Sequence, residues 1–143
     1  MVEAQQSEAT ATAGSSRPVI VVWYSSKPEG RAALKRGVTE AELRKADLVV
    51  VHTSLDVSVG DLHAELEATG VPYEVKEAAD ALDPAEELLS TAEDRSAEFI
   101  IIGLRRRSPV GKLLLGSNAQ RVLLDAACPV VAVKAEAPSA TAD

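Results

Sequence analysis

Five short runs of apolar, largely β-branched residues recur along the chain, and no two of them are neighbours. They cover residues 18–24, 47–52, 71–76, 99–102 and 128–133. Runs of this length and composition are typical of strands that are buried on both faces, and segments with helical spacing lie between them. Strands that are joined through helices pair in parallel. The order therefore predicts an α/β fold: a three-layer sandwich in which helices cover both faces of a five-stranded parallel sheet.

The first two helical segments follow the first two strands. Residues 31–45 carry apolar side chains at near-helical spacing, Leu43 among them, with charged residues in between. Residues 60–69 form a shorter helix that Gly70 ends, since glycine readily adopts the left-handed conformation found after helices. The strand at 71–76 contains a proline, which predicts a place at an edge of the sheet.

The last two helices have recognisable starts. Asp83 is placed to cap a helix whose first residue is Pro84, and a glutamate stands at the third helical position. The other helix begins at Gly116 or Ser117. Residues 104–115, which precede it, are expected to form a loop, because they combine charged residues with proline and glycine.

The folded part is expected to be one domain. The chain has 143 residues, a length that suits a single domain with its own core. Residues 1–17 are mostly small and polar, and they lack the basic and apolar regions of a secretory signal. We therefore expect a flexible tail at 1–17, a domain at 18–134 and a second flexible tail at 135–143. The cytoplasm is the expected location.

Charge and composition exclude several classes of function. The net charge of −7 argues against nucleic acid and membrane surfaces as partners, because both need clustered positive charge. With one cysteine and two histidines, the chain lacks the ligands of a cysteine zinc cluster, and no metal site is expected. The sequence also offers no nucleophile motif and no evident Ser-His-Asp set, so catalysis by a nucleophile is not expected.

The predicted sheet places a ligand crevice beside its first and fourth strands. Parallel sheets of this kind often have the strand order 3-2-1-4-5, which reverses between those two strands. The loops after Tyr24 and Ile102 would then face the same crevice. The second loop, 103–118, contains three glycines, four basic residues and no acid, and it ends at a helix N-terminus, which favours an anion. A bound phosphate and a solvated basic loop with turn-forming glycines are both consistent with this composition.

Three stretches of the sequence carry a resemblance to a known family. They are IIIGLR at 100–105, GS at 116–117 and CPVVAV at 128–133. Together they resemble universal stress proteins, whose nucleotide-binding members have the motif G-x2-G-x9-G-[ST]. The resemblance covers nearly all of residues 18–134. It implies the same α/β fold and a stress-response module that binds an adenine nucleotide, ATP or AMP. Whether magnesium accompanies the nucleotide stays open.

The resemblance assigns residues of the motif to the phosphates. Gly103 matches its first glycine, and Gly116 with Ser117 matches its last pair. Backbone amides and the serine hydroxyl would hold phosphate oxygens there, beside Arg105. Arg106 stands in place of the second glycine, where its guanidinium could contact phosphate directly.

The other expected contacts flank this phosphate site. Gly111 and Asn118 belong to the same loop and helix start. Tyr24 stands where the family has an aspartate that contacts the nucleoside, and its ring could stack on the base beside His52. A structural role is the favoured alternative for His52. Trp23 lies within an apolar strand and is expected to pack in the core or at an interface rather than on a ligand.

Two functions rank above a third, a small α/β hydrolytic or transferase enzyme that would use His52. The first two differ in whether the crevice is open or closed. In the first, the chain is a nucleotide-binding module, not an enzyme beyond slow incidental ATP hydrolysis, and it signals through a dimer. In the alternative, Tyr24 and Arg106 close the crevice of a dimeric interaction protein that binds no nucleotide. Both include a homodimer through the final strand, since residues 128–133 are apolar, lie at a sheet edge and match the strand through which the family commonly dimerises.

Overall fold

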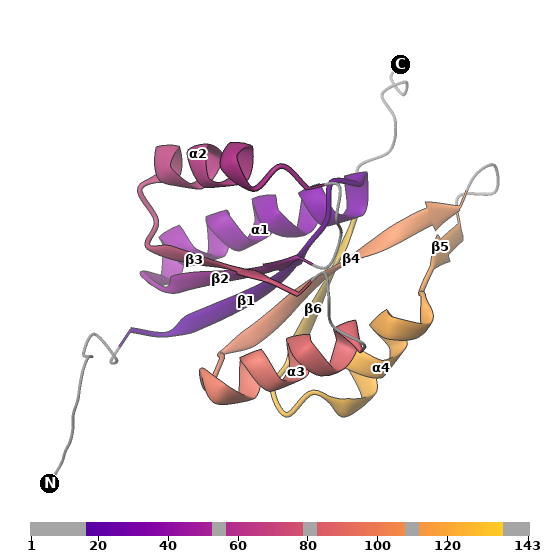
Figure 1. Cartoon of the computed structure of the whole chain (residues 1–143). Coiled ribbons are helices and arrows are strands. Elements are labelled where there is room, and N and C mark those ends of the chain that lie inside the picture. The colour runs from indigo at the N-terminus through magenta and orange to yellow at the C-terminus, as the bar shows by residue number, and fades with distance from the viewer. Residues whose placement is uncertain (1–16, 53–56, 79–82, 108–111, 136–143) are drawn as a thin grey trace, which may run out of the picture.

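The predicted parallel sheet is confirmed. The computed structural model describes residues 17–52, 57–78, 83–107 and 112–135. Its parallel strands are β1 (Val19–Tyr24), β2 (Asp47–His52), β3 (Tyr73–Glu77), β4 (Phe99–Arg107) and β6 (Val130–Lys134). They lie in the order β3-β2-β1-β4-β6 (Figure 1). Counted along the parallel strands alone, this is the expected order 3-2-1-4-5.

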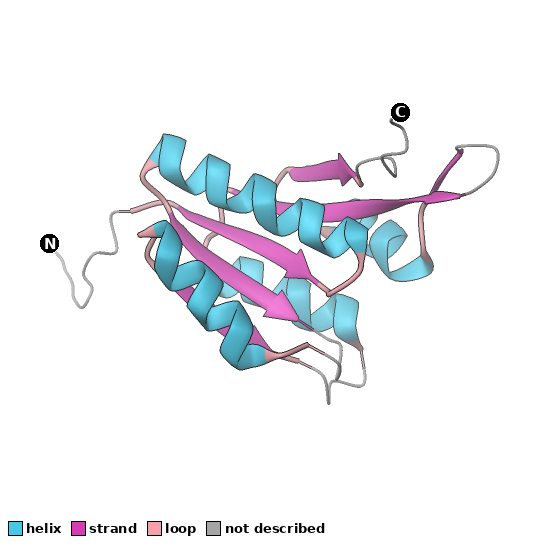
Figure 2. Ribbon diagram, turned by 90° about the horizontal axis from the view of Figure 1, so that it is seen from above, coloured by secondary structure: helices cyan, strands magenta, loops and turns pink. Residues whose placement is uncertain are grey.

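Helices cover both faces of the sheet (Figure 2). Helices α1 (Pro28–Arg44) and α2 (Val59–Thr69) pack on one face, and α3 (Pro84–Asp94) and α4 (Ser117–Asp125) pack on the other. Each face has its own cluster of buried apolar side chains. The central strands are therefore enclosed from both sides, as their continuous apolar sequences require. Within the described residues, the helices are too short or too polar to cross a membrane.

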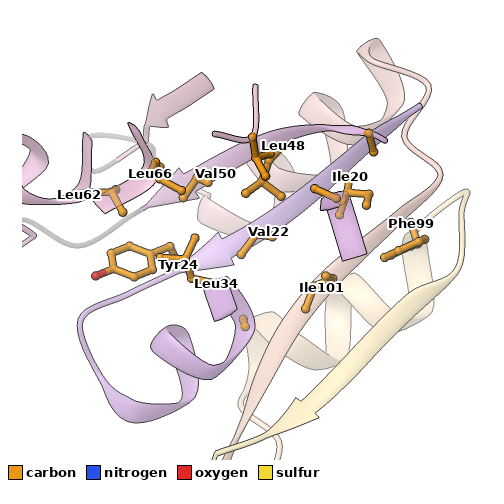
Figure 3. Packing of buried hydrophobic residues seen from close by; sticks show 14 residues of the cluster. Ile20, Val22, Tyr24, Leu34, Leu48, Val50, Leu62, Leu66, Phe99 and Ile101 are labelled. Carbon is orange, nitrogen blue, oxygen red and sulfur yellow. The ribbon is translucent and has the colours of Figure 1, made fainter. Parts of the chain in front are cut away.

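Alternation along β1 decides which layer each of its side chains joins. Val22 and Tyr24 point toward α1 and α2, where they belong to the same buried cluster as Leu34 and Leu66 (Figure 3). Val21 and Trp23 point toward α3 and α4. Successive side chains of a strand alternate between its faces, so neighbours in this sequence belong to different layers of the protein.

The prediction that residues 104–115 form a loop is wrong in part. Strand β4 continues to Arg107 and pairs in antiparallel register with β5 (Lys112–Leu114), from Arg105↔Leu114 to Arg107↔Lys112. The two strands extend past the rest of the sheet as a ribbon (Figures 1 and 2). Their pairing lies beyond the helical layers. The alternating apolar pattern that marks a half-buried strand is therefore not required there.

Smaller differences concern the ends of elements. Helix α1 begins at Pro28, a favoured residue for the first helical position, and Leu43 in its last turn is 74% exposed rather than part of the inner stripe. Arg17 and Ala135, expected in the tails, are held by the domain. Arg17 Nε donates to Asp47 Oδ1 at 2.6 Å, and Ala135 is buried. The remaining residues of both predicted tails lie outside the described part of the chain.

The expected cap of α3 is present and is tied to α4. Asp83 Oδ1 accepts a hydrogen bond from the Glu86 amide at 3.1 Å, and Pro84 occupies the first helical position. Arg121 of α4 donates to Asp83 Oδ2 and, at 2.8 Å, to Glu86 Oε1. One guanidinium therefore joins the start of α3 to α4 on this face of the sheet.

Replacement of Asp83 by asparagine should reveal this ion pair through its pH dependence. The hydrogen bond from Arg121 is the main cause of the lowered pKa of Asp83, and the Glu86 amide adds to it. A carboxyl with a depressed folded-state pKa stabilises the fold above its unfolded pKa, and that contribution is lost as the pH falls through the folded value. We expect Asp83→Asn, which retains a capping oxygen, to melt below wild type at neutral pH and to match it in strong acid. A gap in melting temperature that does not depend on pH would contradict this.

Candidate functional site

A cleft opens where β1 and β4 part. Their pairing ends at Val22↔Ile101, although both strands continue beyond it. The cleft has a volume of about 520 Å³. It lies at the carboxyl ends of the strands on either side of the reversal in strand order, which is where open parallel sheets bind ligands.

The cleft is built from two strand ends and two helix starts. The ends of β1 and β4 form part of its wall, and the first turns of α1 and α4 form the rest. The described lining residues are Trp23, Tyr24, Ser25, Lys27, Glu29, Gly30, Ile102, Gly103, Arg105, Gly116, Ser117, Asn118 and Ala119. The residues that sequence reasoning assigned to the phosphates therefore meet residues from the turn after β1.

The predicted residues are divided among three places. Six of them border the cleft: Tyr24, Gly103, Arg105, Gly116, Ser117 and Asn118. His52 is absent from the described lining. The side chain of Arg106 and the whole of Gly111 lie outside the described part of the structure, so their predicted roles stay predictions.

The two helices that begin at the cleft have no side-chain cap among the described residues. The N-cap residues are Lys27 for α1 and Gly116 for α4, and neither provides a capping hydrogen bond. Away from the cleft, Ser58 and Asp83 cap α2 and α3 through their side-chain oxygens. The first amides of a helix have no partner within it. Those of α1 and α4 are thus directed at one cleft, with the positive ends of two helix dipoles.

Gly103 has a packing role at this site. A Cβ on Gly103 would overlap the backbone of Glu29 in the first turn of α1. Gly30 in the same turn is equally constrained, because its Cβ would overlap Ser25. The two glycines let α1 begin directly against β4 and the end of β1, which brings its N-terminus to the cleft. Gly116 is different, since a Cβ there would meet no atom of the described residues within 4 Å.

The charges at the cleft are of both signs. Lys27 and Arg105 bring cationic side chains and Glu29 brings a carboxylate. Arg105 is exposed, so its guanidinium is available at the rim. No group of three or more potential metal ligands occurs among the described residues. Together with the two helix N-termini, the cations favour an anionic ligand.

Tyr24 borders the cleft with its ring turned away from it. The residue is 5% exposed and belongs to the cluster under α1 and α2. Its hydroxyl accepts a hydrogen bond from Arg31 Nη1 at 3.0 Å. Arg31 also donates to both carboxylate oxygens of Glu65, at 3.2 and 3.1 Å, and these bonds, then the one to Tyr24, raise the pKa of Arg31. Tyr24 therefore ties β1 to α1 and α2 and does not fill the cleft.

His52 is on the same side of the sheet as Tyr24. The two are register partners in β1 and β2, and His52 shares the face of Leu48 and Val50 by strand alternation. It is 1% exposed, and neither ring nitrogen has a hydrogen-bond partner among the residues that the structure describes. The structure therefore places it in the core, outside the described lining of the cleft.

Substitution of His52 by leucine should stabilise the fold. A buried polar group without a partner costs free energy that an apolar side chain of similar size does not. We expect the free energy of unfolding in urea to rise by about 1 kcal/mol. His63→Leu is the matched control, because His63 is exposed and its Nδ1 lies 3.0 Å from the Tyr73 hydroxyl. It should give no such gain. A loss of stability in His52→Leu would mean that the ring is held by a partner in solution.

Sequence reasoning missed the turn that follows β1. Ser25, Lys27, Glu29 and Gly30 all border the cleft, as does Trp23, which was expected to pack away from ligands. The available signal was their position, since the first strand had already been placed beside the crevice. A KPEG segment at a helix start carries no motif that would have singled out these residues.

The comparisons agree with this fold. The universal stress protein family model matches residues 61–134. A universal stress protein of Mycolicibacterium smegmatis is 42% identical over 127 residues, which cover 81% of this chain and 97% of that protein. Among solved structures, a universal stress protein from Archaeoglobus fulgidus has a TM-score of 0.61 and 28% identity, over 82% of this chain and 98% of that one.

A further structure shares the fold at lower identity. It is the universal stress protein from Archaeoglobus fulgidus in complex with dAMP, with a TM-score of 0.54 and 23% identity over 82% of this chain and 98% of that one. The family-model match spans the loop and helix that border the cleft, and the Mycolicibacterium relative matches over nearly its whole length. This chain belongs to the universal stress protein family.

Proposed function

We propose that this chain is a stress-response module that binds an adenine nucleotide, ATP or AMP, in the cleft between β1 and β4. The observation that carries the proposal is that two helix N-termini, neither of them capped by a side chain within the described part of the chain, meet in one cleft. Phosphate oxygens would accept hydrogen bonds from the first amides of α4 and from Ser117, and Arg105 would add charge at the rim. The relative in complex with dAMP supports this choice of ligand.

The dimensions of the cleft suit such a ligand. Its volume of about 520 Å³ lies within the range of roughly 300 to 1,000 Å³ that small-molecule sites occupy. Tyr24, which the alternative requires as a plug, borders the cleft, but its ring packs in the cluster under α1 and α2 and its hydroxyl is held by Arg31. The alternative, an interaction protein with a closed crevice, therefore depends on Arg106 to close it. Failure to bind nucleotide in the titration described below would favour this alternative.

We also propose that the protein is not an enzyme, apart from slow incidental hydrolysis of ATP. Glu29 is the only carboxylate among the described lining residues. Rapid phosphoryl transfer requires a positioned base and groups that hold the metal and the transferring phosphoryl. Magnesium is therefore proposed as optional for binding.

A homodimer through β6 is part of the proposal. Strand β6 pairs with β4 on one side, and no described strand pairs with its other edge. Its valines Val131 and Val133 are only partly buried. An apolar edge strand invites pairing with a second chain. Sedimentation equilibrium at micromolar concentration should give the mass of a dimer, and a monomer there would exclude it. A cytoplasmic location stays a prediction.

The decisive experiment is a calorimetric titration of nucleotide-free protein with AMP and ATP, with and without magnesium. Extraction and mass spectrometry of the purified protein should precede it, because a bound nucleotide can remain through purification. Saturable binding at micromolar concentration is the expected result. Failure to bind at millimolar nucleotide would reject the proposal and favour the interaction protein with a closed crevice.

A further inference from the structure

The side chain of Trp23 lies in the layer of α3 and α4. The start of α4, where the phosphate is proposed to bind, belongs to the same layer. Trp23 borders the cleft and packs, partly buried, against the cluster under α3 and α4. Ala119, in the first turn of α4, borders the cleft and packs against the same cluster. The indole and the free amides at the start of α4 therefore lie on one side of the sheet.

The two residues expected to contact the base are on the other side. Tyr24 and His52 are both at least nine-tenths buried and face the layer of α1 and α2. The Tyr24 hydroxyl is also engaged by Arg31. Both rings therefore pack in the layer opposite the one that Ala119 joins at the start of α4. Trp23 borders the same cleft from the layer of α3 and α4.

We propose that the heterocyclic base of the ligand lies against the indole of Trp23, with its phosphate at the N-terminus of α4. This inference rests on the proposed nucleotide binding and names the residue that distinguishes a nucleotide from a bare sugar phosphate. Stacking on a tryptophan requires only a flat aromatic ring on the ligand. Trp23 thus gives the cleft selectivity for a ring-bearing phosphate, while the helix amides would hold any phosphate.

The wild-type protein can report on the contact directly, because Trp23 is the only tryptophan in the chain. Nucleotide-free protein is titrated with AMP and, separately, with ribose 5-phosphate, while binding is followed by calorimetry and by tryptophan emission. We expect AMP to give a saturable change in emission with the same midpoint as the heat. Ribose 5-phosphate should bind more weakly and change the emission less.

Two variants separate the ring contact from the phosphate contact. Trp23→Leu should lower AMP affinity about tenfold and leave ribose 5-phosphate affinity unchanged. Trp23→Phe keeps an aromatic face and should retain AMP affinity within about threefold. Thermal melting shows whether each variant is folded. If Trp23→Leu is unfolded, the emission titration of the wild type tests the contact between Trp23 and the base.

The outcomes keep the two proposals apart. AMP binding by calorimetry without a change in wild-type emission, or with equal affinity in Trp23→Leu, would overturn the Trp23 contact and leave nucleotide binding intact. An equal fall in affinity for AMP and ribose 5-phosphate in Trp23→Leu would also overturn it, because the loss would not involve the ring. If neither ligand binds the wild type, the proposed function itself fails.

Discussion

Gly116→Asp is expected to abolish nucleotide binding without loss of stability. Gly116 is the N-cap of α4, with extended backbone (φ −70°, ψ 167°) that any residue can adopt. A Cβ there meets no described atom within 4 Å, so we expect the new side chain to be accommodated without loss of stability. Aspartate is among the best N-cap residues, and its carboxylate would accept hydrogen bonds from the same amides that are proposed to hold phosphate.

This variant is informative because AMP affinity should fall while the stability of the fold is retained or slightly increased. The carboxylate replaces the ligand as acceptor and repels its phosphate. We therefore expect affinity for AMP to fall by at least about a hundredfold in calorimetry, since hydrogen bonds to charged groups contribute roughly 1.5–3 kcal/mol each. The melting temperature should be unchanged or slightly raised, since aspartate exceeds glycine as a cap by only about a few tenths of a kcal/mol.

Gly60→Asp is the matched control for charge. Gly60 lies in the first turn of α2, its Cβ would also meet nothing within 4 Å, and it does not border the cleft. It makes the same change in net charge near a different helix start. AMP affinity should remain within about twofold of wild type, because the new charge does not border the cleft and exposed charges are screened by salt. Unchanged AMP affinity in Gly116→Asp would place the phosphate elsewhere.

The fold could be predicted because its signals are local. Each strand is a compact apolar run, and each connection is long enough to hold a helix, so parallel pairing and the crevice between β1 and β4 followed. The ribbon of β4 and β5 was missed for a physical reason. It lies beyond the helical layers, where burial does not impose a pattern on residues such as Arg105.

The sequence predicted where the cleft lies in the sheet. It did not predict which layer the side chains at the end of β1 face. Gly116 and Ser117 were placed at the cleft because a helix start can be recognised from sequence. Tyr24 was assigned to the ligand because it ends a strand at the crevice and stands where the family has an aspartate that contacts the nucleoside. A strand that is apolar on both faces has no alternation to show which layer a given residue joins. Only the packing in three dimensions shows that Tyr24 faces α1 and α2 and Trp23 faces α3 and α4.

Gly103→Ala is expected to destabilise the protein strongly, although Gly103 also borders the cleft. The new Cβ would overlap the carbonyl of Glu29. A helix backbone cannot move aside as a flexible side chain can, so α1 must shift away from β4. Overpacking of this kind costs about 1–3 kcal/mol. We expect the free energy of unfolding in urea to fall by about 3 kcal/mol, at the upper end of that range.

Gly60→Ala tests whether this loss belongs to the contact or to glycine replacement in general. Its Cβ lies in open space on a helix, where alanine is preferred to glycine, and it should raise stability by about 0.5 kcal/mol. A loss below about 0.5 kcal/mol in Gly103→Ala would mean that α1 is not held tightly against β4. The large loss that we expect would show that Gly103 is required by the fold, whether or not a nucleotide is bound. Binding studies of the cleft should therefore use Gly116, where the fold makes no such demand.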